Sequence, residues 1–114
     1  MKEYQLQKAV CKYLDLQNVL YCGSMGGQYQ PHFSQRIRSR KSCYKRGFPD
    51  LFIYVPVGKW HGLAIELKTG YNRATKDQLK WRNDLNKRGY IAEICNGLDE
   101  TISVIETYLA GYIK

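Results

Sequence analysis

Two short apolar segments joined by a turn constrain the fold of this chain more than any other feature. Residues 47–55 read Gly-Phe-Pro-Asp-Leu-Phe-Ile-Tyr-Val, and residues 63–68 read Leu-Ala-Ile-Glu-Leu-Lys. Apolar side chains alternate with period two in both segments, which predicts two β-strands. Residues 56–62 between them contain one proline and two glycines, as is typical of a hairpin loop.

This hairpin is expected to bring three charged side chains together. Folding about position 58 or 59 places Asp50 opposite residues 66–68. Glu66 and Lys68 share one face of their strand because side chains alternate along a strand. Two carboxylates and one ammonium group then converge at one end of the hairpin, which is costly as core structure but suits a metal site. The alternative is a salt bridge of Asp50 or Glu66 with Lys68 on an exposed sheet face.

The segments around the hairpin predict helices. Apolar residues spaced three and four apart indicate helices over residues 3–14 and from Leu98 to Leu109. Residues 75–78 read Thr-Lys-Asp-Gln, which fits a capping box. The basic helix that follows is expected to end before Gly89.

Short apolar runs at residues 19–22 and 90–95 predict two further strands. The strand–helix–strand order at the end of the chain implies a parallel pair with a right-handed crossover. The complete order is α-β-β-β-α-β-α. It predicts an α/β fold in which helices flank a mixed four-stranded sheet, within a single domain of residues 1–114.

The positive charge of the chain is concentrated in one segment. The formal net charge is +8, and no acidic residue occurs between Asp15 and Asp50. The interval contains all six candidate DNA-binding residues: Arg36, Arg38, Arg40, Lys41, Lys45 and Arg46. Such a block favours nucleic acid as a partner, the alternative being a solvated basic loop. It carries no base-reading motif, so we expect contacts to phosphates and to the shape of the DNA. A short helix over residues 34–40 is compatible with the sequence.

The four cysteines do not predict a zinc site or a disulfide framework, because they are widely spaced and form no C-x-x-C motif. Cys11, Cys22 and Cys95 fall in helix or strand patterns and are predicted to be small core residues, whereas Cys43 is expected to be exposed. The apolar runs are only strand-sized, so we expect no membrane span, no signal peptide and a cytoplasmic location.

The charged end of the hairpin suits phosphodiester hydrolysis. Mg²⁺ and Mn²⁺ prefer oxygen ligands, which Asp50 and Glu66 supply. The backbone carbonyl of Leu67 offers a third protein oxygen. A bound metal polarises the phosphate and lowers the pKa of water. Lys68 is suited to orient the attacking water and to offset the developing negative charge.

These motifs resemble those of the PD-(D/E)XK nucleases, and more narrowly the stand-alone phage and bacterial type of virus-type replication-repair nuclease (VRR-NUC) domain. The matching residues are Glu3 with Gln7, Gly47-Phe48-Pro49-Asp50, Glu66-Leu67-Lys68, Gln78 with Trp81, and Gly89-Tyr90. The resemblance spans nearly the whole chain. It implies a restriction-endonuclease-like core, a metal site formed by Asp50, Glu66 and the Leu67 carbonyl, and Lys68 as the catalytic lysine.

The resemblance also implies roles for two residues on helices. Glu3 would place a further acidic group at the metal, and Gln78 would contact phosphate or the nucleophile. Each residue has an alternative role at a helix terminus, through the helix dipole for Glu3 and through the capping box for Gln78.

The resemblance also implies a substrate class, because small stand-alone members of the family from phages and bacteria resemble dimeric, structure-selective DNA nucleases, including ones that act on four-way (Holliday) junctions. We therefore expect a Mg²⁺- or Mn²⁺-dependent endonuclease that acts on branched DNA as a homodimer. The alternatives are a nuclease for flaps, nicks or linear duplex, and a non-catalytic DNA-binding module. Near the C-terminus, Tyr108, Tyr112 and Ile113 either form the dimer interface or close the core.

Overall fold

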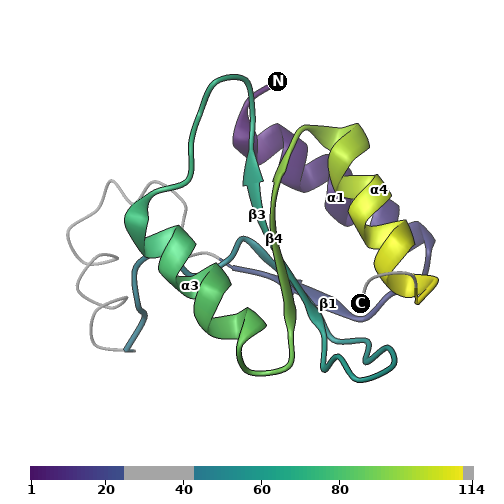
Figure 1. Ribbon diagram of the computed structural model, residues 1–114. Helices are drawn as coiled ribbons and strands as arrows, with labels where there is room; N and C mark the ends of the chain where they lie inside the picture. The colour runs from purple at the N-terminus through teal and green to yellow at the C-terminus, as the bar shows by residue number, and fades with distance from the viewer. Residues whose placement is uncertain (25–42, 112–114) are drawn as a thin grey trace.

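The computed structural model describes residues 1–24 and 43–111 (Figure 1). The elements in chain order are α1 (Glu3–Leu16), β1 (Tyr21–Gly23), β2 (Leu51–Ile53), β3 (Leu63–Lys68), α3 (Lys76–Asn86), β4 (Ile91–Asn96) and α4 (Leu98–Leu109). The strands form one sheet in the order β1-β2-β3-β4, in which only β3 and β4 are parallel. The predicted mixed four-stranded sheet with flanking helices is therefore confirmed.

The sheet is covered on both faces, with α1 and α4 on one face and α3 on the other (Figure 1). The larger core lies under α1 and α4. The buried side chains that form it on the sheet and the two helices include Leu6, Val10, Leu14, Leu63, Ile65, Leu67, Ile105 and Tyr108. The smaller core lies under α3 and contains Ala64, Leu85 and Ala92. Because side chains alternate along β3, Glu66 and Lys68 lie on the face of Ala64, which is the α3 face.

The β2–β3 hairpin has the predicted register. Leu51 pairs with Ile65 and Ile53 with Leu63. Continuing this register by one residue places Asp50 opposite Glu66. The turn is closed by Val57 and Trp60, whose backbones exchange hydrogen bonds of 3.0 and 2.9 Å. The predicted centre near position 58 is therefore correct.

The first predicted strand is displaced by two residues, and one cysteine lies elsewhere than expected. β1 begins at Tyr21 instead of residue 19, because the backbone N–H of Val19 still donates a hydrogen bond to the Leu14 carbonyl at the end of α1.

Cys95 is buried and Cys11 packs against the core, as predicted. Cys43 is exposed, also as predicted. Cys22 is exposed, so the prediction that it is a core residue was wrong. Its side chain is on the α3 face of the edge strand β1, but α3 packs on β4 at the opposite edge of the sheet and does not cover it.

Tyr108 closes the core of the protein and is not an interface residue, because its side chain is fully buried. Tyr112, Ile113 and the predicted short helix over residues 34–40 lie outside the described residues. In the part of the chain that the structure describes, no helix is long and apolar enough to cross a membrane.

The buried hydroxyl of Tyr108 allows a test of this core. It donates a 2.7 Å hydrogen bond to the carbonyl oxygen of Val55, 53 residues away in the chain. We expect Tyr108→Phe to lower the free energy of unfolding by about 1–2 kcal/mol, because this carbonyl loses its donor. Urea unfolding measures the change. Tyr71→Phe is the control, since Tyr71 is fully exposed; an equal loss in both variants would contradict the assignment.

Candidate active site

The register of the hairpin and the first helix together hold Asp50. Its Oδ2 accepts a 2.8 Å hydrogen bond from the backbone N–H of Leu67 on β3. Its own carbonyl oxygen accepts a 3.4 Å bond from Nε2 of Gln7 on α1. Pro49, directly before it, is buried. The Asp50 carboxylate therefore lies at the end of β3 that carries Glu66.

The glycine before this segment permits a close approach to the start of α3. Gly47 has φ of +88°, and a Cβ at this position would lie 2.6 Å from the backbone carbon of Asp77. Both the positive φ and the lack of space require glycine. The approach places Phe48 edge-on to Trp81, with ring centroids 5.0 Å apart. The loop before β2 and helix α3 thus form two walls of one site.

Glu66 and Lys68 are buried on the α3 face, with 6% and 7% of their surfaces exposed. Oε2 of Glu66 accepts a 3.0 Å hydrogen bond from Nε2 of Gln78. Oε1 of Glu66 is buried and has no hydrogen-bond partner among the described residues. The alternative of a salt bridge on an exposed face is therefore wrong for these two side chains.

The electrostatics of the site show a deficit of positive charge. The pKa of Glu66 is raised to about 9, most of all by burial and next by the neighbouring carboxyl of Asp50. Lys68 acts in the opposite direction and lowers the Glu66 pKa, while Glu3 raises it. Without a cation, Glu66 thus retains a proton at neutral pH. A buried carboxylate with an unpartnered oxygen is a group that a metal ion stabilises.

The Leu67 carbonyl is directed toward the same site. In a β-strand, the N–H and C=O of one residue point to the same edge. The Leu67 N–H points to Asp50, so its carbonyl also faces the β2 side. If the β2–β3 register continues, the residue opposite Leu67 is Pro49, which has no N–H to donate. The sheet therefore offers no ladder partner from β2 to this oxygen.

Gln78 fills the predicted capping role and also contacts one of the candidate metal ligands. Its N–H donates to Oγ1 of Thr75 at 3.2 Å, and its Oε1 accepts from the Thr75 N–H at 2.9 Å, which completes the predicted capping box. The same side chain uses Nε2 to hold Glu66. The cap thereby fixes the orientation of Gln78 toward the site. Contact of Gln78 with phosphate or the nucleophile stays a prediction.

Candidate site residues of α1, the β2–β3 hairpin and α3 line a common pocket of about 400 Å³. Its lining includes five of the site residues predicted from the sequence, which are Glu3, Arg46, Asp50, Glu66 and Gln78. Glu3 comes from the first turn of α1, and its Oε2 accepts a 3.1 Å hydrogen bond from Nδ2 of Asn72. Lys68 is not among the lining residues but lies buried on the same face of β3.

Three residues at this site were not found from the sequence: Tyr44, Asn72 and Asp77. Tyr44 lies in the loop before Gly47, where no periodic pattern marks it. Burial raises its pKa, as do the nearby carboxylates Glu66 and Asp50. Asp77 lines the pocket because of the close approach of Gly47 to α3.

The donor atoms of the site fit a hard divalent cation. Asp50 and Glu66 provide carboxylate oxygens and Leu67 a carbonyl oxygen, the ligand types that Mg²⁺ and Mn²⁺ favour. Within residues 1–24 and 43–111, no three side chains of His, Cys, Asp or Glu form a metal-binding group together. The described set is thus two carboxylates plus backbone oxygen, and direct ligation by Glu3 stays a prediction.

The predicted basic loop is described only at its end. Arg36, Arg38, Arg40 and Lys41 lie outside the described residues. Lys45 and Arg46 are exposed, and Arg46 lines the pocket that holds Asp50 and Glu66. One part of the basic loop therefore lies at the site.

Comparison with known proteins agrees with this geometry. The family model of the VRR-NUC domain matches residues 1–99, which include Asp50, Glu66, Lys68 and Gln78. A solved structure described as a VRR_NUC domain protein has a TM-score of 0.76 and 28% sequence identity to this chain. That similarity covers 97% of this chain and 90% of the other. No curated protein matches the sequence. The chain therefore belongs to the VRR-NUC family, and membership implies a nuclease-type function in DNA processing.

Proposed function

We propose that this protein is a Mg²⁺- or Mn²⁺-dependent endonuclease that hydrolyses phosphodiester bonds in branched DNA, such as four-way junctions. The observation that carries the proposal is the buried Oε1 of Glu66, which lies beside the Asp50 carboxyl and has no hydrogen-bond partner in residues 1–24 and 43–111. A stable fold keeps such an oxygen buried only if another group satisfies it. A divalent cation does so and also explains why two carboxylates lie together.

The roles of the residues follow from their positions. Asp50, Glu66 and the Leu67 carbonyl would hold the metal, which supplies Lewis acidity and a bound water of lowered pKa. Gln78 keeps the Glu66 carboxylate in one orientation through its 3.0 Å bond. Lys68 orients the attacking water and offsets negative charge on the phosphate. A bond forms between the water oxygen and phosphorus, and one ester bond from phosphorus to oxygen breaks.

The proposed substrate class rests on symmetry as well as on family. Two identical sites in a two-fold dimer suit a symmetric four-way junction, because each site can cut one strand. Leu16, Leu20 and Tyr54 are exposed apolar side chains near the edge strand β1, and they provide surface for such a dimer. The basic residues near the pocket supply contacts to phosphates, which do not depend on sequence.

Removal of either charged group at the site should stop cleavage. We expect Asp50→Asn and Lys68→Ala each to reduce cleavage of a labelled junction by at least about 100-fold, because metal binding or transition-state charge stabilisation is lost. DNA binding should remain within about threefold of wild type. Lys59→Ala is the matched control, since Lys59 lies on the β2–β3 turn. Full cleavage by either site variant, or by wild type with a chelator, would sink the proposal.

The raised pKa of Glu66 predicts a pH-dependent stability in the metal-free protein. The folded protein retains the Glu66 proton up to about pH 9, whereas the ordinary pKa of the group is 4.5. The folded state therefore binds more protons between these values, and its stability should fall as pH rises through this window. Added Mg²⁺ displaces the proton, so its stabilising effect should grow with pH.

Thermal unfolding in EDTA at pH 5 to 9, repeated with Mg²⁺, measures both effects. Glu66→Gln should be less sensitive to pH, since the amide cannot titrate, and should gain little from Mg²⁺. Glu93→Gln is the control, because Glu93 is an exposed residue of β4. Equal pH dependence in wild type and Glu66→Gln would show that Glu66 does not hold the extra proton.

The substrate is tested with a panel made from shared strands. We expect a four-way junction to be cut at least about tenfold faster than a flap, a nick or a linear duplex at equal Mg²⁺, a difference of about 1.4 kcal/mol in the activation barrier. Faster cutting of the flap, nick or duplex would assign the protein to that class of DNA nuclease. Binding without cleavage of any substrate would identify a non-catalytic module.

A further inference from the structure

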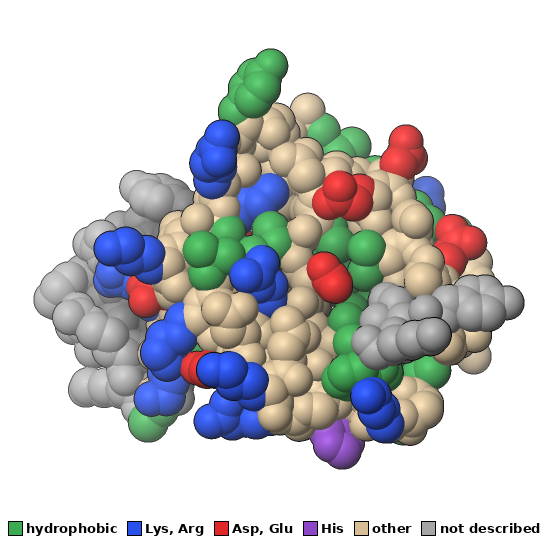
Figure 2. Space-filling view, in the orientation of Figure 1, with side chains coloured by type: hydrophobic (Ala, Val, Ile, Leu, Met, Phe, Trp, Pro, Cys, Tyr) green, Lys and Arg blue, Asp and Glu red, His purple; other side chains and the backbone are tan. Residues whose placement is uncertain are grey.

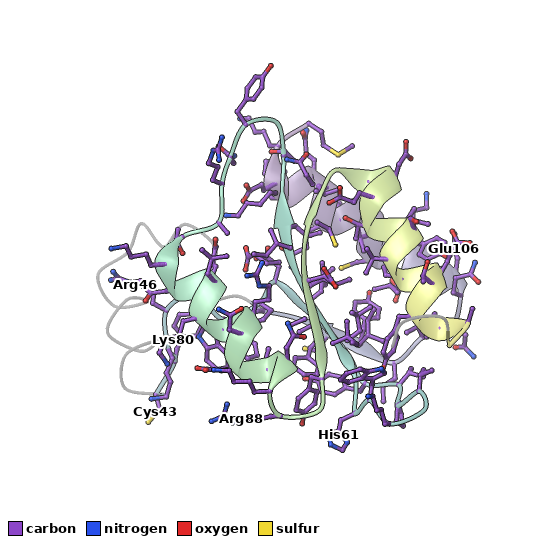
Figure 3. All side chains as sticks on the ribbon, viewed as in Figure 1. Cys43, Arg46, His61, Lys80, Arg88 and Glu106 are labelled. Carbon is purple, nitrogen blue, oxygen red and sulfur yellow. The ribbon has the colours of Figure 1, made fainter. Side chains whose placement is uncertain are left out.

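A second pocket adjoins the candidate active site. It has a volume of about 450 Å³, and its lining within the described chain is Lys45, Arg46, Asp77, Lys80, Trp81 and Asp84. We call it the α3 pocket. It shares Arg46 and Asp77 with the pocket that holds Asp50 and Glu66. Figure 3 shows Arg46 and Lys80 on the same side of α3. The two pockets therefore form one continuous surface.

An aromatic ring held in a fixed orientation lines the α3 pocket. Nε1 of Trp81 donates a 3.2 Å hydrogen bond to the Arg46 carbonyl. Phe48 contacts the ring edge-on, with centroids 5.0 Å apart. Trp81 is nevertheless only partly buried. A partly exposed tryptophan between basic residues is the arrangement that binds the sugar and base of a nucleic-acid strand.

The two pockets differ in charge. Among the described residues, the active-site pocket is lined by the carboxyl groups of Glu3, Asp50, Glu66 and Asp77 and by one cation, Arg46. The described lining of the α3 pocket has three cations and two carboxylates. Lysine and arginine side chains gather over α3 in Figure 2. Phosphates that flank the scissile bond are attracted to the α3 pocket, where cations outnumber carboxylates among the described residues.

The ion pairs of Asp84, a residue of the α3 pocket, can be exchanged for contacts to phosphate. Nζ of Lys80 lies 3.0 Å from Asp84, and Arg88 lies 4.0 Å from the same carboxylate. The side chains are 77% exposed for Lys80, 67% for Arg88 and 39% for Asp84. Exposed pairs of this kind contribute little to stability, because solvent screens the two charges. Asp84 thus competes weakly with an incoming phosphate for these two cations.

We propose that the α3 pocket binds the DNA nucleotide next to the scissile phosphate. Lys80 and Arg46 contact its phosphate, and Trp81 packs against its sugar and base. This assignment rests on the proposed nuclease function. It specifies in addition where the DNA strand runs after it leaves the active site. The contact is independent of sequence, because it uses charge and the face of an aromatic ring.

Fluorescence anisotropy with a labelled four-way junction, in the Asp50→Asn background with Mg²⁺, tests the Lys80 contact. Lys80→Ala should weaken binding roughly three- to tenfold and lower the slope of log K against log salt by about 1. Asp84→Asn breaks the same ion pair but leaves both cations, so it should strengthen binding. Lys59→Ala, which removes one positive charge on the β2–β3 turn, should leave binding nearly unchanged. Equal weakening by Lys80→Ala and Asp84→Asn would overturn the proposal, because the ion pair would then matter only for structure.

Tryptophan fluorescence tests the aromatic wall separately. The chain has two tryptophans, so Trp60→Phe leaves Trp81 as the only one. In the Asp50→Asn background, binding of the unlabelled junction should quench its emission, and an unchanged emission at saturation would overturn the contact.

The two proposals fail in different ways. Suppose that the wild-type protein does not cleave any DNA with Mg²⁺, but Lys80→Ala weakens and Asp84→Asn strengthens DNA binding. The nuclease function is then contradicted, and the DNA-binding role of the α3 pocket remains supported. If wild type cleaves while both substitutions leave binding unchanged, the pocket alone is overturned.

Discussion

The structure depends on one contact, the hydrogen bond from the Leu67 N–H to the Asp50 carboxylate. It replaces a backbone ladder bond at the point where β2 stops pairing with β3. It fixes Asp50 opposite Glu66, and it implies that the Leu67 carbonyl faces the same side. A slip of one residue in this register would turn Glu66 and Lys68 to the other face of the sheet. Asp50 is therefore both the end of the hairpin and a part of the site.

The second constraint is the burial of charge beneath α3. Glu66 and Lys68 occupy positions on β3 where the sheet is otherwise apolar, next to the small core around Ala64. Burial makes ionisation of Glu66 unfavourable, and Lys68 offsets only part of this effect. The same low-dielectric surroundings would strengthen binding of a cation. Burial of these ionisable groups therefore lowers the stability of the fold at the proposed active site.

Helix α3 connects the two pockets. Its first turn uses Gln78 both to cap the helix and to hold Glu66, so the start of the helix and the orientation of the carboxylate are coupled. The close approach of Gly47 places the loop before β2 against this turn. Trp81, one turn further along, connects the active site to the basic surface of the helix. One helix can thus contribute to both proposed functions, catalysis and DNA binding.

The sequence by itself determined the order of the elements, the register of the hairpin and the placement of Asp50 opposite Glu66, because alternation and turn chemistry are local properties. It did not determine which face of the sheet α3 would cover, so the burial of Glu66 and the exposure of Cys22 followed only from packing. Tyr44, Asn72 and Asp77 join the site through contacts between segments far apart in the chain. Such contacts leave no periodic signal, and only the tertiary structure decided them.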